Sequence, residues 1–171
     1  MKVHLRALEP KGAEGMLEWM TDPEIACFFR FDTAKITIDS CLKFISSSTQ
    51  NVECKHYAIA DDIDNYLGTI SLKDIDTDKK TAEYAISTRR YVHGTGVAFQ
   101  ATEEVLKIAF EQLHLQRVYL NVLVNNVRAN VFYKKIGFRF ERLEEHAIVI
   151  RDEWKALNWY AINREDFLRE Y

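Results

Sequence analysis

Two glycines, Gly94 and Gly96, stand directly before an apolar helical stripe in the segment YVHGTGVAFQATEEVLKIAFEQL, residues 91–113. Glycine lets the backbone turn with positive φ, and the unpaired N–H groups at a helix start, together with the helix dipole, attract phosphate. The segment is therefore a candidate phosphate-binding loop. The alternative is a turn that only opens a helix.

Two well-known nucleotide-binding loops do not fit this segment. A dinucleotide-binding loop needs Gly or Ala as its third small residue, but the register that begins at Gly94 places Phe99 there. The following strand ends in VNN, residues 124–126, without the acidic residue that binds a ribose. A P-loop needs Gly-Lys-Ser/Thr after four spacer residues, and the sequence has none. Both of these nucleotide-binding readings fail.

A second motif follows about thirty residues later. Asn126, Ala129 and Tyr133 recur at i, i+3 and i+7, on one face of a helix, and Gly137 and Phe138 come next. The loop HGTGVA, residues 93–98, and this N-x-x-A-x-x-x-Y-x-K-x-G-F motif together resemble the Gcn5-related N-acetyltransferases (GNAT). The stretch LEWMTDPEI, residues 17–25, is similar to the opening of the RimJ/RimL-type branch of that family.

The resemblance implies an acetyl-CoA-dependent N-acetyltransferase. It places the pantetheine arm and acetyl group on main-chain groups of the fourth strand and the pyrophosphate on the glycine loop. Acetyl-CoA is the expected co-substrate. The cofactor-binding residues that the resemblance implies are Ile86, Ser87, His93, Gly94, Thr95, Gly96, Val97, Ala98, Asn126, Ala129 and Tyr133.

The same resemblance implies direct attack of an amine on the thioester, with Tyr133 and Glu83 as the catalytic residues. Tyr133 would protonate the departing thiolate, and Glu83 or a water relay would take the proton of the amine. A strand N–H near Ile86 would stabilise the oxyanion. The alternatives are core packing for Tyr133 and, for Glu83, a solvated face or a cross-strand partner such as Lys73.

The loop departs from the family pattern at two positions. His93 stands where Gln or Arg is usual, and Thr95 replaces a residue that is often basic. If a protonated His93 supplies charge, cofactor binding weakens above pH of roughly 6.5. The alternative is a neutral histidine that makes one hydrogen bond in the turn.

The resemblance implies that the acceptor is a primary amine, either a small molecule such as a nucleotide-linked amino sugar or a protein N-terminus. The segment ACFFRFDTAK, residues 26–35, combines Phe28, Phe29, Arg30 and Phe31 in an inter-helix loop, where the family often shapes its acceptor site. These side chains could stack on a nucleotide base or pack into the core. A catalytically idle acyl-CoA-binding module is the competing function.

The order of elements predicts a mixed α+β fold. Its central sheet is mostly antiparallel and twisted, with helices on both faces, in the order β-α-α-β-β-β-α-β-α-β-β, within a single domain over residues 1–171. We expect a second helix at about 39–48 with Asp39 as a possible N-cap. Strands are expected near 2–8, at 55–60, 66–75, 80–87 and 117–124, and in a closing hairpin of 138–150 and 153–162; helices are expected around 16–20, up to 113, and at 126–136.

Composition excludes several other classes. Twenty-three basic and 26 acidic residues give a net charge of −3, which disfavours nucleic acid as a partner. No apolar run is long enough to cross a bilayer, and MKVHLRALEP lacks a signal core, so we expect a cytoplasmic protein. The three cysteines and five histidines show no metal-ligand spacing, so no metal is expected. A homodimer is possible.

Overall fold

Seven strands form one sheet in the computed structural model, which describes residues 1–170. Their order across the sheet is β1-β2-β3-β4-β5-β7-β6, and every pairing is antiparallel except the parallel pairing of β4 with β5. The strands are β1 (Val3–Ala7), β2 (Lys55–Asp61), β3 (Tyr66–Asp76), β4 (Thr81–Thr88), β5 (Arg117–Leu123), β6 (Arg139–Ile150) and β7 (Glu153–Asn163).

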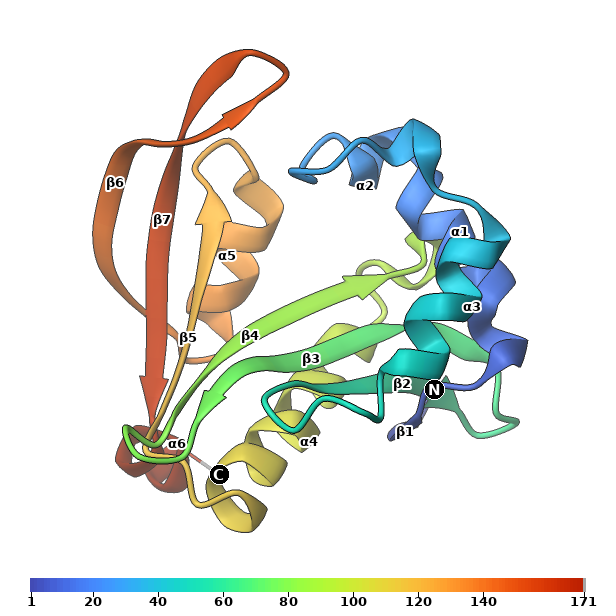
Figure 1. Cartoon of the computed structure of the whole chain (residues 1–171). Coiled ribbons are helices and arrows are strands. Elements are labelled where there is room, and N and C mark those ends of the chain that lie inside the picture. Colours follow the sequence, from blue (N-terminus) through green and yellow to red (C-terminus); the bar gives the residue numbers. More distant parts are fainter. Residues whose placement is uncertain (171) are drawn as a thin grey trace.

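The parallel pairing in the middle of the sheet is short. It joins only Thr81, Ala82 and Glu83 of β4 to Arg117, Val118 and Tyr119 of β5. Beyond Glu83 the two strands diverge, and Figure 1 shows them leaving one another toward the ends that face α1 and α5. The sheet is therefore open along the second half of β4.

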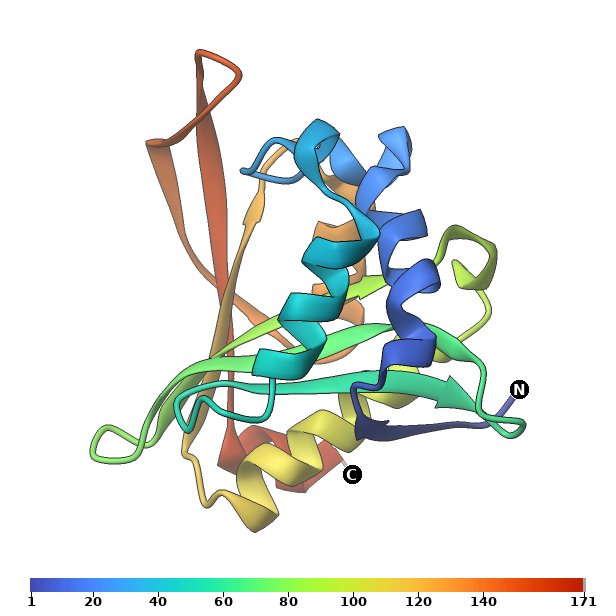
Figure 2. The same cartoon turned by 45° about the vertical axis from the view of Figure 1, so that its right-hand side comes forward.

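Helices cover both faces of the sheet, as the sequence predicts. In Figures 1 and 2, α1 (Ala13–Thr21) and α3 (Ile38–Ser47) lie across one face and α4 (Val97–Lys107) crosses the other. The remaining helices are α2 (Pro23–Ala26), α5 (Val127–Lys135) and α6 (Arg164–Glu170). Short 3-10 turns occupy Pro10–Gly12, Thr33–Lys35 and Arg90–Val92, and a π-helical turn continues α4 over Ile108–Gln112.

Apolar side chains from the predicted stripe of α4 build the larger core. Val97, Ala101, Val105 and Ala109 are fully buried against strands β3, β4 and β5. A second cluster, which includes Met16, lies between α1, α3 and the sheet. The two clusters therefore pack on opposite faces of the sheet.

Two details differ from the sequence-based expectation. The N-cap of α3 is Thr37 rather than Asp39: its Oγ1 accepts the N–H of Ser40 at 3.2 Å, and the Ser40 hydroxyl accepts the N–H of Thr37. A threonine in this reciprocal box, one residue before Ile38, fixes the helix start at Ile38. The helix α6 was not predicted, although Asn163 stands directly before it and Glu165 and Asp166 lie in its first turn, because its seven residues are too few to show an apolar helical repeat. Phe167 holds it, buried against Phe110.

Within the described residues, no helix has the length and apolar character needed to span a bilayer.

Candidate active site

The peptide groups of β4 alternate between two neighbours. The N–H of Arg89 donates to the carbonyl of Leu67 at 2.8 Å, so odd-numbered residues of β4 direct their main-chain groups toward β3. Even-numbered residues direct theirs toward β5. At Ile86, β5 has already diverged, so the N–H and carbonyl of Ile86 face the opening without a partner strand.

Ser87 differs from Ile86 in this respect. It is paired with Thr69 in the β3 register, and its main-chain groups point toward β3. The register therefore argues against the predicted main-chain contact of Ser87 with a cofactor. The single-residue alternation of a strand explains the difference, because adjacent residues cannot both face the same neighbour.

The glycine loop presents free N–H groups. Gly94 and Gly96 have φ of 78° and 86°, and a Cβ built at either residue would meet nothing within 4 Å. Within residues 1–170, the N–H groups of Gly94, Gly96, Val97 and Ala98 have no acceptor. These groups converge at the start of α4, where an anion is favoured.

The other two positions of the predicted loop are occupied internally. The N–H of His93 donates to the carbonyl of Arg90 at 3.0 Å, and the N–H of Thr95 donates to the carbonyl of Val92 at 3.3 Å. The Thr95 hydroxyl also donates to Val92, at 2.7 Å. His93 and Thr95 thus shape the loop, and their main-chain N–H groups are not available to a phosphate.

Arg128 lies against the His93 ring, with Nη2 3.2 Å from Nε2. Burial, followed by the charge of Arg128, lowers the pKa of His93. His93 is therefore neutral at neutral pH, which agrees with the turn-histidine alternative rather than with a charged one. The fixed positive charge beside the loop belongs to Arg128, which sequence reasoning missed although it stands two residues after Asn126 in the motif.

The first turn of α5 is built by the motif residues themselves. The Oδ1 atom of Asn126 accepts the N–H of Ala129 at 3.2 Å and caps the helix. Asn130, which sequence reasoning also missed, is buried and donates to the carbonyls of Leu123 and Asn126. Its Oδ1 accepts the Tyr160 hydroxyl at 2.9 Å. These bonds fix α5 to the ends of β5 and β7.

Tyr133 points from α5 into an aromatic enclosure. Its ring contacts those of Tyr84, Phe138 and Tyr160, and only 9% of the residue is exposed. Burial raises the pKa of its hydroxyl well above the usual value. Among residues 1–170 the hydroxyl has no hydrogen-bond partner. Tyr133 therefore both packs in the core and keeps a proton that is free to be donated.

Glu83 forms an ion pair with Lys73 on the neighbouring strand, which was one of the alternatives that the sequence left open. It lies opposite Lys73, and Lys73 Nζ is 3.2 Å from Glu83 Oε1. Glu83 is the last residue of β4 that pairs with β5. Ile86 is three residues further, about 10 Å along the strand, so Glu83 can reach an atom beside Ile86 only through water.

Glu83 and Tyr133 belong to opposite faces of the sheet. Tyr84 faces Tyr133 and bonds Thr102 of α4 at 2.7 Å, so strand alternation turns Glu83 the other way. Tyr119 of β5 shares the face of Glu83 and stacks near Trp159 of β7. An amine on the Glu83 face and a leaving group on the Tyr133 face would meet at the opening between them.

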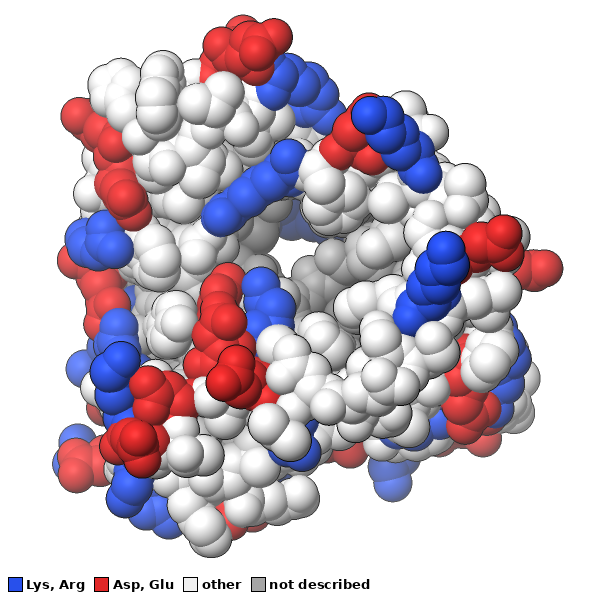
Figure 3. Space-filling model, viewed as in Figure 1, with Lys and Arg blue, Asp and Glu red and all other residues white. Residues whose placement is uncertain are grey.

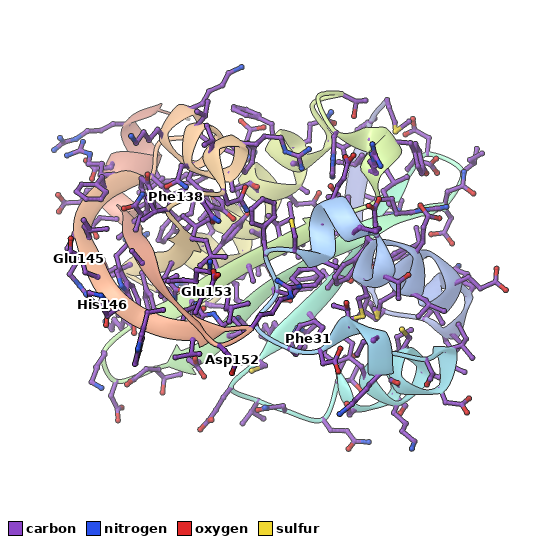
Figure 4. The ribbon with its side chains drawn as sticks, turned by 90° about the horizontal axis from the view of Figure 1, so that it is seen from above. Phe31, Phe138, Glu145, His146, Asp152 and Glu153 are labelled. Carbon is purple, nitrogen blue, oxygen red and sulfur yellow. The ribbon has the colours of Figure 1, made fainter. Side chains whose placement is uncertain are left out.

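A pocket of about 280 Å³ lies on the Glu83 face, between the segment after α2 and the tip of the β6/β7 hairpin. Figure 4 shows Phe31 on one side and Asp152 and Glu153 on the hairpin side. In Figure 3 the surface is hollowed at its centre, with basic side chains on the upper rim and both acidic and basic side chains on the lower rim. The pocket is lined by Phe29, Arg30, Phe31, Asp32, Thr33, Ile150 and Arg151.

The phenylalanines of residues 28–31 differ in whether they pack into the core or are exposed to a ligand. Phe28 packs against the small core of Leu123, Ile150 and Leu157. Phe29 packs edge-on against Trp19, whereas Phe31 is 46% exposed and stacks on Phe29 with centroids 5.1 Å apart. Phe31 is thus the ring that a ligand can reach.

Comparison with known proteins gives one family match. A family model described as an acetyltransferase (GNAT) domain matches residues 2–139. Spermidine N(1)-acetyltransferase of Escherichia coli (strain K12) is 27% identical over 104 residues, 61% of this chain and 56% of that protein. The putative ribosomal N-acetyltransferase YdaF of Bacillus subtilis (strain 168) is 25% identical over 58% of this chain and 55% of that protein. The matched region spans little more than half the length of each relative.

Solved structures show the same fold over nearly the whole chain. Spermidine N-acetyltransferase from Vibrio cholerae, in complex with CoA and spermine, has a TM-score of 0.87 at 21% identity and covers 97% of this chain and 98% of its own. A probable acetyltransferase has a TM-score of 0.83 at 22% identity, covering 99% of this chain and 94% of its own. The predicted fold class is confirmed. The predicted RimJ/RimL branch is not supported by these relatives.

Proposed function

The chain belongs to the acetyltransferase (GNAT) domain family, and on that premise we propose that it transfers the acetyl group of acetyl-CoA to a primary amine. The observation that carries the proposal is the opening beside Ile86, whose free peptide groups lie on the strand that leads to the free N–H groups of the glycine loop. A thioester substrate with a diphosphate needs both features.

The residues of the loop fit a diphosphate. Gly94, Gly96, Val97 and Ala98 each offer a main-chain N–H, and the space where side chains would stand is open at both glycines. Arg128 offers a positive charge next to the loop through its contact with His93. We assign the diphosphate to these groups and the pantetheine arm to Ile86. Direct contacts from Asn126 and Ala129 remain a prediction, since the Asn126 side chain already accepts the N–H of Ala129 as the cap of α5.

Acetyl-CoA, when bound, supplies the activated acyl carbon. The amine has a pKa of roughly 10 and must lose a proton before or during attack. A water molecule takes that proton and passes it to Glu83, which lies about 10 Å from Ile86 along β4. The N–H of Ile86 donates to the oxygen that becomes negative as the new C–N bond forms. As the C–S bond breaks, the Tyr133 hydroxyl donates its proton to sulfur and recovers one from solvent.

The acceptor is proposed to be a small molecule. The pocket on the Glu83 face holds about 280 Å³, near the lower end of ligand-binding cavities. Relatives named for spermidine acetylation point to small amines. The protein N-terminus implied by the RimJ/RimL resemblance has less support. An idle acyl-CoA-binding module would not need a proton donor, whereas the Tyr133 hydroxyl is protonated and makes no hydrogen bond within residues 1–170. A homodimer remains a prediction.

Release of CoA measured against a panel of amines tests the proposal. We expect turnover that requires both acetyl-CoA and an amine, with an acetylated product detected by mass spectrometry. Tight acetyl-CoA binding without turnover on any amine would favour the idle module. If calorimetry detects no binding of acetyl-CoA at millimolar concentration, the assignment of the glycine loop is wrong.

A further inference from the structure

Two arginines of the pocket on the Glu83 face carry uncompensated charge. Arg30 donates from Nη2 to the Oδ1 atom of Asn121, and Arg151 donates from Nη1 to the carbonyl of Cys27 at 3.4 Å. Both acceptors are neutral, and within residues 1–170 neither arginine has a carboxylate partner. Nearby Arg142 and Arg117, in contrast, are paired with Glu144 and Glu141.

The carboxylates near this pocket do not cancel the two charges. Asp32, the acidic residue of the lining, accepts the N–H of Ala34 at 3.0 Å and lies 4.0 Å from Lys35. Glu153 at the hairpin tip is paired with Lys155. Asp152 is exposed at the same tip but does not line the pocket. The pocket is therefore positively charged.

Arg30 connects this pocket to the opening of the sheet. Its partner Asn121 lies on β5 two residues beyond Tyr119, where pairing with β4 ends. Asn121 also shares the face of Tyr119 and Glu83, because strand residues alternate. A molecule whose amine enters the opening on this face would place its remaining atoms against Arg30 and Arg151.

A flat apolar surface adjoins the two cations. Phe31 is stacked on Phe29 with an angle of 14° between the rings, and Phe29 is supported by Trp19. The exposed ring therefore has a fixed orientation. Guanidinium groups bind phosphate oxygens in a forked geometry, and a fixed aromatic face stacks on planar rings.

We propose, on the premise of the transferase function above, that the acceptor is an amine carried on a nucleoside phosphate. Arg30 and Arg151 bind its phosphate groups and Phe31 stacks on its base. This acceptor is an anion, unlike the spermidine named for the relatives. A polycation would meet two unpaired arginines at the entrance.

Acceptor selectivity is the first test. CoA release is measured with UDP-glucosamine, glucosamine 6-phosphate, glucosamine and spermidine at equal concentration. We expect kcat/KM for UDP-glucosamine to exceed that for spermidine by about 10-fold or more, with glucosamine 6-phosphate between UDP-glucosamine and glucosamine. Acetylation of spermidine in preference to UDP-glucosamine would overturn the inference and leave the transferase function intact.

Binding of UDP alone is the second test, and it does not depend on turnover. Calorimetry should detect UDP binding to the wild-type chain, weakened about 10-fold in Arg30→Gln and Arg151→Gln. Phe31→Leu should weaken it also. The controls are Arg139→Gln, an arginine paired with Asp166 elsewhere on the surface, and Phe140→Leu, another exposed phenylalanine. Unchanged UDP affinity in both arginine variants, or no UDP binding at millimolar concentration, would refute the site.

Discussion

Burial holds the proton on Tyr133. The ring is enclosed by Tyr84, Phe138 and Tyr160, and the pKa of its hydroxyl is raised well above the usual value. A tyrosine whose pKa is raised remains protonated throughout the neutral range, so its hydroxyl carries the proton that a departing thiolate requires, while burial alone makes it a weaker acid. The enclosure also fixes the direction in which the hydroxyl points.

The first prediction concerns Tyr133→Phe. We expect kcat to fall by about 10²-fold or more, since general acid catalysis contributes on that scale, while acetyl-CoA affinity stays the same. Steady-state kinetics and calorimetry measure the two quantities separately. Tyr84→Phe is the matched control, because it removes a buried hydroxyl bonded to Thr102 and should cost about 1 kcal/mol of stability with little change in kcat. Equal kcat in wild type and Tyr133→Phe would remove Tyr133 from the mechanism.

The second prediction concerns the pH dependence that His93 confers. Its folded-state pKa is lowered, so the unfolded chain takes up this proton at a higher pH than the folded chain does. The free energy of unfolding should therefore decline as pH falls from about 6.5 through the folded-state pKa. Urea denaturation at pH 7.5 and 5.5 should show a smaller decline in His93→Gln. His56, whose pKa burial also lowers, accounts for part of what remains.

Because the pKa of His93 is lowered, its ring is neutral at neutral pH and supplies no positive charge to the cofactor. Acetyl-CoA affinity should be flat between pH 7 and 8. A third prediction is that Arg128→Gln weakens acetyl-CoA binding about tenfold, because a charge-assisted contact is lost. Lys134→Gln, an exposed lysine in the last turn of α5, is the control and should bind normally. A marked fall in wild-type affinity between pH 7 and 8 would contradict the neutral histidine.

Among the elements, α5 is held by a network around one buried side chain. Asn130 bonds Leu123, Asn126, Asn158 and Tyr160, and thereby holds the helix that carries Tyr133. Asn130→Ala would leave these buried groups without partners, at about 1–3 kcal/mol for each group that water cannot reach. We expect a large loss in free energy of unfolding by urea denaturation. Val131→Ala, exposed on the next position of α5, should be close to neutral. Equal stability of the two variants would show that the network is unimportant.

The order of the helices and strands could be predicted from the sequence, because the spacing of apolar residues and the turn residues are visible within short stretches of the chain. The hairpins of β2, β3 and β4 and the buried stripe of α4 follow from them. The start of α3 was misplaced because Thr37 and Asp39 are both good caps and only their contacts decide. The α6 helix was missed because its stability comes from Phe167 packing on Phe110.

At the scale of the whole molecule, the site arises where two parts of the sheet separate. Only three residue pairs join β4 to β5, so the position of the opening depends on register rather than on any motif. Sequence therefore predicted the loop and Tyr133 as site residues and assigned both Ile86 and Ser87 to the cofactor, whereas the register turns only Ile86 toward the opening. It also missed Arg128, which reaches the loop only because α5 packs beside it. The extent of the domain over 1–171 remains a prediction.

Because the opening between β4 and β5 separates two parts of the sheet, a cofactor bound there should stabilise the whole chain. A ligand at about 100 times its Kd raises the free energy of unfolding by about 2.7 kcal/mol. We predict that shift for acetyl-CoA in urea denaturation. Acetyl-pantetheine, which lacks the diphosphate, should give far less at the same concentration, because it leaves the N–H groups of Gly94, Gly96, Val97 and Ala98 unused. Equal stabilisation by the two compounds would mean that the glycine loop does not anchor the cofactor and that the thioester arm alone provides the binding energy.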